Sequence, residues 1–184
     1  MAVHKKRNFL TFLFDFFEIA IISATIFLLV YLFVGQLLEV TGESMTPTLL
    51  DKEQVIAEKI SIRFNPLSRG QIVIFKHPEQ NDRLLIKRVI GLPFDNIKIV
   101  DGYVYINGSM LNEPYLSAST LTYPNKSISA GTELTVPESS YILMGDNREK
   151  SSDSRSFGPV RRELIIGKAA AVYYPFSDFR LLEH

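Results

Sequence analysis

Two short segments of the sequence carry the side chains that a hydrolase needs, a nucleophile and a base. Ser44 lies in Ser44-Met45-Thr46-Pro47-Thr48, a proline-bounded turn, and Lys87 follows an apolar run on a predicted strand. A serine in such a turn can attack a carbonyl carbon if a nearby base removes its proton. Each residue also has a simpler interpretation. Ser44 could cap a helix or occupy an ordinary turn, and Lys87 could be an edge-strand lysine that blocks aggregation.

Lysine acts as a base near neutral pH only if its charged form is disfavoured. Lowering its pKa from ~10.4 to ~7.5 takes about 4 kcal/mol, which desolvation in an apolar site can supply. Lys87 has suitable neighbours, because Leu84-Leu85-Ile86 precedes it and Val89-Ile90 follows Arg88. Strand alternation places Leu85, Lys87 and Val89 on one face of the predicted strand.

Histidine is the more usual base, but the three histidines do not favour a Ser-His-Asp triad. His4 precedes the apolar stretch described below, His184 is the last residue, and His77 lies in a polar turn between two predicted strands. We expect His77 to be a solvated surface residue. The chain has no cysteine, which excludes thiol catalysis and cysteine-based zinc or iron–sulfur sites.

A third segment is suited to holding other groups in place. Residues 144–158 directly follow an apolar strand and carry two glycines together with many short hydroxyl and carboxylate side chains. Side chains of this kind favour a hydrogen-bonded scaffold over a plain solvated loop.

An uncharged apolar stretch precedes these segments and indicates a membrane anchor. Ile19 through Leu38 contains no Asp, Glu, Lys, Arg or His. At ~1.5 Å per residue its helix would be about 30 Å long, the thickness of a bilayer's hydrocarbon core. The stretch is longer than a signal-peptide core and Gln36 to Val40 offers no small-x-small cleavage site, so we expect an uncleaved signal-anchor. Lys5, Lys6 and Arg7 place the amino terminus in the cytoplasm by the positive-inside rule.

The remainder of the chain alternates apolar and polar residues with turns at short intervals, a pattern typical of strands. Asp101-Gly102 separates two such runs and favours a type I′ hairpin. The fold class we expect is mainly β, a transmembrane helix followed by a curled antiparallel sheet or partial barrel. The expected organisation is a basic cytoplasmic terminus (1–18), an anchor helix (19–38) and an extracytoplasmic β-rich domain (39–184) with a surface loop or excursion (107–131).

Together these segments resemble type I signal peptidases, the membrane-bound Ser-Lys proteases that remove signal peptides from exported proteins. Order and spacing agree across nearly the whole domain after the anchor, and the single anchor and compact size resemble the Gram-positive type. The sequence departs from the family pattern at Gln71, often Asp, and at Phe94, usually Gly. The matching segments are Ser44-Met45-Thr46-Pro47-Thr48-Leu49, residues 69–75, Lys87-Arg88-Val89-Ile90-Gly91, and residues 145–148 followed by Ser151, Asp153-Ser154-Arg155 and Phe157-Gly158.

The resemblance implies roles for several residues of these segments and for residues beside them. It makes Ser44 the nucleophile, Lys87 the general base and Ser151 the hydroxyl that orients the lysine. Some family members place an oxyanion-hole serine where this chain has Gly42, so we expect the backbone N–H groups of Ser44 and Gly42 to serve instead. The implied structural support comes from Arg88, Asp153 and Arg155, and the implied pocket walls are Val40, Gly42, Met45, Leu49, Leu85 and Ile86.

The same resemblance implies the partners. The substrates would be signal peptides of secreted preproteins, cut after small-x-small sites and bound as an added strand. Membrane lipid and proximity to the export translocon are expected, whereas nucleic acid, metal and cofactor are not. The expected location is the plasma membrane with the catalytic domain on its outer face. At most about 20 Å of extended chain separates Leu38 from Ser44, so cleavage would occur close to the bilayer.

Two other functions remain open. A self-cleaving regulatory Ser-Lys protease of the LexA-like kind predicts a DNA-binding helical region and no membrane span, the opposite of this amino terminus. A non-catalytic membrane-anchored β-domain that binds envelope partners predicts that Ser44 is not labelled by a serine-acylating probe.

Overall fold

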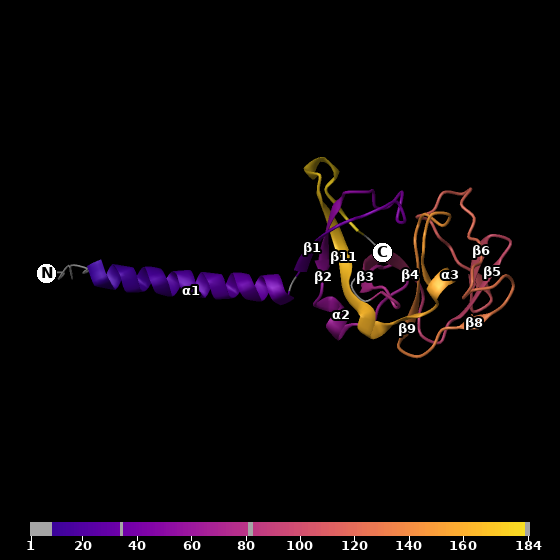
Figure 1. The fold of residues 1–184 in the computed structure, drawn as a ribbon, viewed down its shortest axis with the longest axis horizontal. Helices are drawn as coiled ribbons and strands as arrows, with labels where there is room; N and C mark the ends of the chain where they lie inside the picture. Colours follow the sequence, from indigo (N-terminus) through magenta and orange to yellow (C-terminus); the bar gives the residue numbers. More distant parts are fainter. Residues whose placement is uncertain (1–8, 34, 81–82, 183–184) are drawn as a thin grey trace.

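A long amino-terminal helix leads into a β-rich domain in the computed structural model, which describes residues 9–33, 35–80 and 83–182 (Figure 1). Helix α1 (Phe9–Phe33) extends away from the domain, and the strands form two sheets at different positions along it. The predicted fold class, a mainly β protein with an apolar amino-terminal helix and a curled antiparallel sheet, is confirmed. Lys5, Lys6 and Arg7 lie outside the described residues, as do His4 and His184.

Helix α1 differs in its bounds from the helix expected over 19–38. It includes Asp15 and Glu18 and ends at Phe33, and its segment Phe9–Leu28, with a mean hydropathy of 1.9, is long and apolar enough to cross a membrane. Gly35–Glu39 is not helical but forms strand β1. Pairing with β2 explains the difference, because each of these five residues has an antiparallel partner between Gln54 and Glu58. The backbone hydrogen bonds that a longer helix would make are made to a neighbouring strand instead.

The larger sheet is antiparallel and contains the strands that surround the candidate site. Its order is β1-β2-β11-β3-β4-β9-β10, with β12 paired to β11. Register shifts interrupt the pairing of β11 with β2 and β3 and of β4 with β9, and such irregularities bend and twist a sheet. The strands are β1 (Gly35–Glu39), β2 (Gln54–Glu58), β3 (Ile72–Lys76), β4 (Leu84–Gly91), β9 (Ser140–Met144), β10 (Val160–Arg161), β11 (Ile165–Tyr174) and β12 (Arg180–Leu181).

The smaller sheet lies at the end of the domain remote from α1 (Figure 1). Its order is β7-β6-β5-β8. The predicted Asp101-Gly102 hairpin is confirmed, because the two residues have φ of 50° and 83° and join the paired strands β5 and β6. A type I′ turn requires positive φ at both central positions. The strands are β5 (Asn96–Val100), β6 (Tyr103–Ile106), β7 (Ser109–Met110) and β8 (Leu134–Thr135).

Short helices and one long connection complete the fold. The connection over 107–131 contains only β7, and it packs back on the domain through Ile128 and Thr122, both 1% exposed. It therefore contributes to the core as well as to the surface. The helical turns are α2 (Ser61–Phe64), α3 (Ser154–Phe157), η1 (Arg162–Leu164) and η2 (Phe176–Asp178).

Phe94 has a backbone conformation that favours glycine. Its φ is 70° and its side chain is 68% exposed, so the ring contributes little to the core. A left-handed non-glycine residue costs roughly 1–2 kcal/mol, of which glycine's extra chain entropy offsets part. We expect Phe94→Gly to raise the free energy of unfolding by about 0.5–1 kcal/mol, as measured by urea denaturation. Phe179, 62% exposed at φ −53°, is the matched control: Phe179→Gly should not stabilise, and destabilisation by Phe94→Gly would contradict the prediction.

Candidate active site

The structure brings Ser44 and Lys87 together. Lys87 Nζ lies 2.7 Å from Ser44 Oγ and also donates to the Ile86 carbonyl oxygen at 3.0 Å. Ser44 is half-buried in the turn after β1, a turn anchored by the buried side chains of Met45 and Leu49. Lys87 comes from β4, where it pairs with Val73 of β3. A hydroxyl and an amine from positions 43 residues apart are therefore in hydrogen-bonding contact.

Burial controls the protonation of Lys87. Its side chain is only 2% exposed, so the interpretation as a solvent-facing edge lysine is wrong. Burial lowers the pKa of Lys87 to about 8, the nearby Asp153 carboxylate opposes this shift, and the positive charge of Arg83 adds to it. Alternation along β4 places Leu85 and Val89 on the same face, and both pack in one apolar cluster. About half of Lys87 is therefore neutral at pH 8, where an unperturbed lysine would be almost entirely charged.

Buried ion pairs connect the loop over 145–155 to the residues around the dyad. Arg88 donates from Nε to Asp146 Oδ1 at 2.9 Å and from Nη2 to Oδ2 at 2.6 Å. Asp146 also accepts a hydrogen bond from Thr48 Oγ1 at 2.5 Å, so it joins the turn that carries Ser44 to strand β4, which carries Lys87. Asp146 was not among the expected site residues, although its position directly after the apolar strand β9 was the available signal.

Asp153 and Arg155 form a second buried pair. The Asp153 carboxylate is fully buried and accepts from Arg155 Nε and Nη2, each at 2.8 Å, and from the Gly145 N–H at 3.1 Å. Burial would raise the pKa of Asp153, but the bonds from Arg155 and Gly145, together with nearby Ser151, bring it below its ordinary value. The carboxylate is therefore charged and holds the chain at Gly145, beside the carbonyl of Ser44.

The two backbone N–H groups expected at the oxyanion hole differ in their hydrogen bonding. Among the described residues, no acceptor takes the Ser44 N–H, so this donor is free to face a ligand. The Gly42 N–H, in contrast, donates to Asp51 Oδ1 at 2.7 Å, so the expected help from Gly42 is wrong. Gly42 has φ of 89°, and its left-handed conformation shapes the turn that presents Ser44.

A small apolar pocket of about 90 Å³ adjoins the dyad and is partly lined by residues expected there. Leu49 was also expected to line the pocket but does not, and its side chain is fully buried in the core. Gly42 is also absent from this pocket. Several wall residues come from elements that the sequence did not connect to the site, such as Ile74 of β3. We call this the apolar pocket; its lining is Leu38, Glu39, Val40, Thr41, Ser44, Met45, Ile74, Leu84, Leu85, Ile86 and Lys87.

Comparison with known proteins identifies the family. The model of the family "Signal peptidase, peptidase S26" matches residues 13–174. The chain belongs to this family. It is 35% identical over 188 residues to a signal peptidase I from Bacillus licheniformis, with 98% of each chain covered, and 34% identical over 175 residues to a signal peptidase IB from Staphylococcus aureus (strain Mu50), with 87% of this chain and 91% of that protein covered.

A solved structure of a signal peptidase I from Enterococcus faecalis V583 is also similar. The match has a TM-score of 0.48 at 30% sequence identity and covers 58% of this chain and 98% of that chain.

Ser151 lies beside the dyad of this signal-peptidase family member without making the expected contact. Its Oγ is buried and has no hydrogen-bond partner among the described residues, so the bond to Lys87 is not formed. Gly145 packs against it, and a Cβ at that position would collide with Ser151 Oγ and with the Ser44 carbonyl oxygen. The role of Ser151 as orienter of Lys87 stays a prediction.

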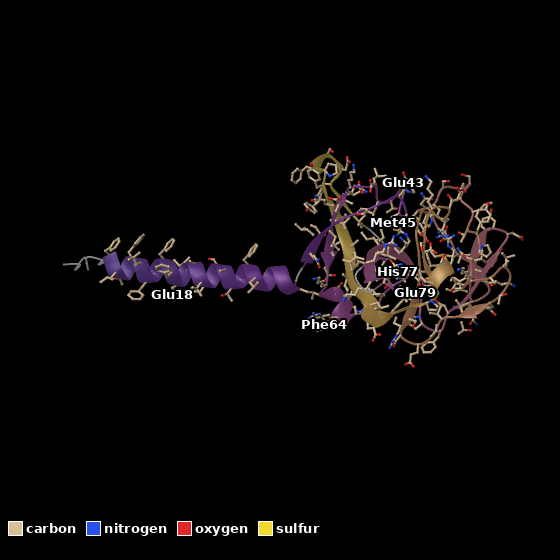
Figure 2. All side chains as sticks on the ribbon, in the orientation of Figure 1. Glu18, Glu43, Met45, Phe64, His77 and Glu79 are labelled. Atoms are coloured by element: carbon tan, nitrogen blue, oxygen red, sulfur yellow. The ribbon has the colours of Figure 1, made fainter. Side chains whose placement is uncertain are left out.

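His77 is not the solvated residue that the sequence indicated. It is 6% exposed, its ring centroid lies 5.1 Å from that of Phe157, and its Nδ1 accepts from the Glu79 N–H at 3.1 Å. Packing on an aromatic ring from a segment 80 positions away explains the burial, which the polar sequence around His77 concealed. Figure 2 shows His77 in the middle of the domain, below Met45 and Glu43 in this view.

The pKa of Lys87 predicts how the rate of a peptidase in this family depends on pH. Only neutral Lys87 can accept the Ser44 proton, and its pKa is about 8. We therefore expect kcat/KM to fall about tenfold per pH unit below this pKa and to level off above it. Cleavage of one peptide substrate from pH 6 to pH 9.5 measures this, with thermal melts at each pH to show that the protein stays folded. A profile that is flat between pH 6 and pH 8 would contradict the assignment of Lys87 as the base.

Proposed function

We propose that the chain is a membrane-associated serine endopeptidase that removes signal peptides from exported preproteins, with Ser44 as nucleophile and Lys87 as general base. The observation that carries this proposal is the 2.7 Å contact between Ser44 Oγ and a lysine that is 2% exposed. A charged surface lysine could not serve as a base, whereas a desolvated one can. The Bacillus licheniformis and Staphylococcus aureus relatives, both named signal peptidases, support the substrate class.

The geometry supports a two-step acyl-transfer mechanism. Neutral Lys87 takes the proton of Ser44 as Oγ attacks the scissile carbonyl carbon. The resulting oxyanion accepts a hydrogen bond from the Ser44 N–H. The tetrahedral intermediate collapses by breaking the C–N bond, and the Lys87 ammonium protonates the departing amine. A water molecule then hydrolyses the acyl-enzyme, with Lys87 again as the base. Bound substrate would bring Ser151 into contact with Lys87 and hold Nζ in line with Oγ.

The pairing of β4 supports binding of the substrate as an added strand. Leu84 through Lys87 pair with β3 on one side, but β9 pairs with β4 only from Arg88 onward. The other side of Leu84–Lys87 is therefore without a strand partner among the described residues. An extended peptide can add to such a free edge through backbone hydrogen bonds, with its alternate side chains in pockets. The apolar pocket lies at this edge, and its small volume favours the small residues that precede a signal-peptide cleavage site.

Helix α1 supports membrane association. No residue of its apolar segment Phe9–Leu28 is buried, and Figure 2 shows side chains extending above and below the helix along a length that the β-rich domain does not cover. A lipid bilayer would cover this surface. With the helix ending at Phe33, the 11 residues to Ser44 span at most about 36 Å, so the nucleophile stays near the membrane. A cytoplasmic amino terminus, an outer-face catalytic domain and proximity to the translocon belong to the same proposal.

The exposed aromatic residues of the domain agree with a bilayer on the α1 side. Phe64 of α2 is 81% exposed and is labelled in Figure 2 at the end of the domain that faces α1. Phe176 of η2 is 79% exposed, and the turn after β11 that carries it lies toward the same end in Figure 1. Aromatic side chains are favourable at the head-group level of a membrane.

Cleavage of a preprotein by the full chain in liposomes tests the proposed function. We expect one cut after a small-x-small sequence, identified by sequencing the new amino terminus. The non-catalytic alternative predicts intact preprotein and no labelling of Ser44 by a serine-acylating β-lactam or penem probe. No cleavage together with no labelling would therefore overturn the proposal.

A further inference from the structure

A second cavity, polar and larger, opens beside the dyad. Its volume is about 230 Å³, and it shares Thr41, Ser44, Leu85 and Lys87 with the apolar pocket. Most of its other walls carry charged or hydrogen-bonding side chains, in contrast to the aliphatic walls of the apolar pocket. We call it the polar recess; its remaining lining is Gly42, Glu43, His77, Arg83, Lys150 and Ser152.

Among the residues that the structure describes, one positive charge of the polar recess has no negative partner. Lys150 is paired with Glu43 at 2.8 Å, and both side chains are largely exposed. Arg83 is also exposed, and no carboxylate of the described residues pairs with its guanidinium. Its charge is nevertheless near the dyad, since it helps to lower the pKa of Lys87. His77 adds a donor at Nε2, because its Nδ1 accepts the Glu79 N–H.

We propose that the polar recess receives the first residues of the mature protein, those that follow the scissile bond, and that Arg83 makes an acidic side chain there favourable. The proposal rests on the proposed function. Both cavities contain the dyad, so a peptide whose scissile bond lies at Ser44 has its two sides in different cavities. The small residues of the signal peptide suit the apolar pocket, which leaves the polar recess for the departing chain. Arg83 is a specificity-determining residue in this arrangement because its guanidinium can bind a carboxylate in a bidentate manner.

Cleavage of matched substrates by the full chain in liposomes tests the role of Arg83. Two sets of three preproteins are compared: one set differs only at the first residue after the cut and the other only at the second, and that residue is Glu, Gln or Lys. An exposed ion pair is worth up to about 1 kcal/mol, so at low salt we expect kcat/KM for the best Glu substrate to exceed that for Gln by up to about fivefold. The Lys substrate should fall below Gln. Arg83→Gln should bring the Glu/Gln and Lys/Gln ratios of kcat/KM close to one, and Arg83→Lys should keep part of the preference for Glu.

Ratios within one enzyme separate specificity from chemistry. Removing the charge of Arg83 also changes the pKa of Lys87, but every substrate uses the same dyad, so this change cancels in the ratio. Arg161→Gln is the matched control, because Arg161 is an exposed arginine on the edge strand β10, paired at 3.0 Å with Glu163. It should leave both the rates and the ratios unchanged.

The outcomes distinguish this proposal from the proposed function. A wild-type Glu/Gln ratio near one at both positions would overturn the proposal, as would a preference that survives in Arg83→Gln. Equal loss of rate for all three substrates in Arg83→Gln, with the ratios unchanged, would also overturn it. A failure of the wild type to cleave any of the substrates would instead contradict the proposed function.

Discussion

Replacing Lys87 by alanine is expected to lower kcat for signal-peptide cleavage by about 10²–10⁴-fold, and Ser44→Ala is expected to abolish the acyl-enzyme altogether. The reason is the geometry of the pair, since Lys87 Nζ is the one basic group within hydrogen-bonding distance of Ser44 Oγ in the described part of the chain. Single-turnover cleavage of a preprotein measures the loss. Lys126→Ala, at an exposed position in the connection over 107–131, is the control and should retain full activity.

Lys87→Met separates loss of the base from loss of the fold. The pKa of Lys87 is lowered from 10.5 to about 8, so the folded state disfavours the charged side chain. At pH values below 8 this difference destabilises the protein by about 3 kcal/mol, and the penalty disappears as pH rises toward 10.5. We therefore expect Lys87→Met to be inactive and yet more stable than the wild type at pH 7. An inactive variant that is also less stable would point to damage to the fold, and an active one would rule out Lys87 as the base.

Asp153→Ala is expected to reduce the free energy of unfolding by about 3–5 kcal/mol. The substitution leaves the guanidinium of Arg155, whose side chain is 5% exposed, buried without its counter-charge and removes the acceptor of the Gly145 N–H. Guanidinium chloride denaturation of the detergent-solubilised protein measures the change. Because Gly145 lies against the Ser44 carbonyl and Ser151, activity should fall as well, even at temperatures where the variant is folded.

Glu163→Ala is the control for the buried pair. The pair between Glu163 and Arg161 has the same chemistry as the pair between Asp153 and Arg155, but its side chains are 62% and 72% exposed. An exposed pair of this kind contributes little, so the free energy of unfolding should change by no more than about 0.5 kcal/mol. Equal effects of the two substitutions would contradict the structural role assigned to Asp153.

Local patterns in the sequence predicted much of the fold. The strands of the domain after the anchor were visible as alternating apolar segments, and Asp101-Gly102 marked its hairpin because only a few residues tolerate positive φ at both turn positions. The end of the helix was not visible. Residues 35–38 belong to the uncharged apolar stretch, and only the pairing of Gly35–Glu39 with β2 separates strand from helix.

The candidate site was also predicted only in part. Motif resemblance connected Ser44 to Lys87, because the family's nucleophile and base are carried by short, specific segments. Three neighbouring side chains or groups were assigned wrongly: Leu49 is in the core and not in the apolar pocket, the Gly42 N–H is bound by Asp51, and His77 is buried against Phe157. In each case the deciding contact is a feature of the folded chain that neither a period-two pattern nor a motif specifies.

By itself the sequence determined the chemical types: a serine in a turn, a lysine among aliphatic residues, a long uncharged apolar segment and the absence of cysteine. These depend on residue identity and short-range spacing. Only the tertiary structure decided that Lys87 is desolvated and within 2.7 Å of Ser44 Oγ, because burial and proximity depend on strands that are distant in the chain. It also decided that two unlike cavities meet at the dyad, one aliphatic and one containing the charge of Arg83, which pairs with no carboxylate in the described part of the chain. A pKa shift and a pocket are properties of packed neighbours, and packing is what folding adds.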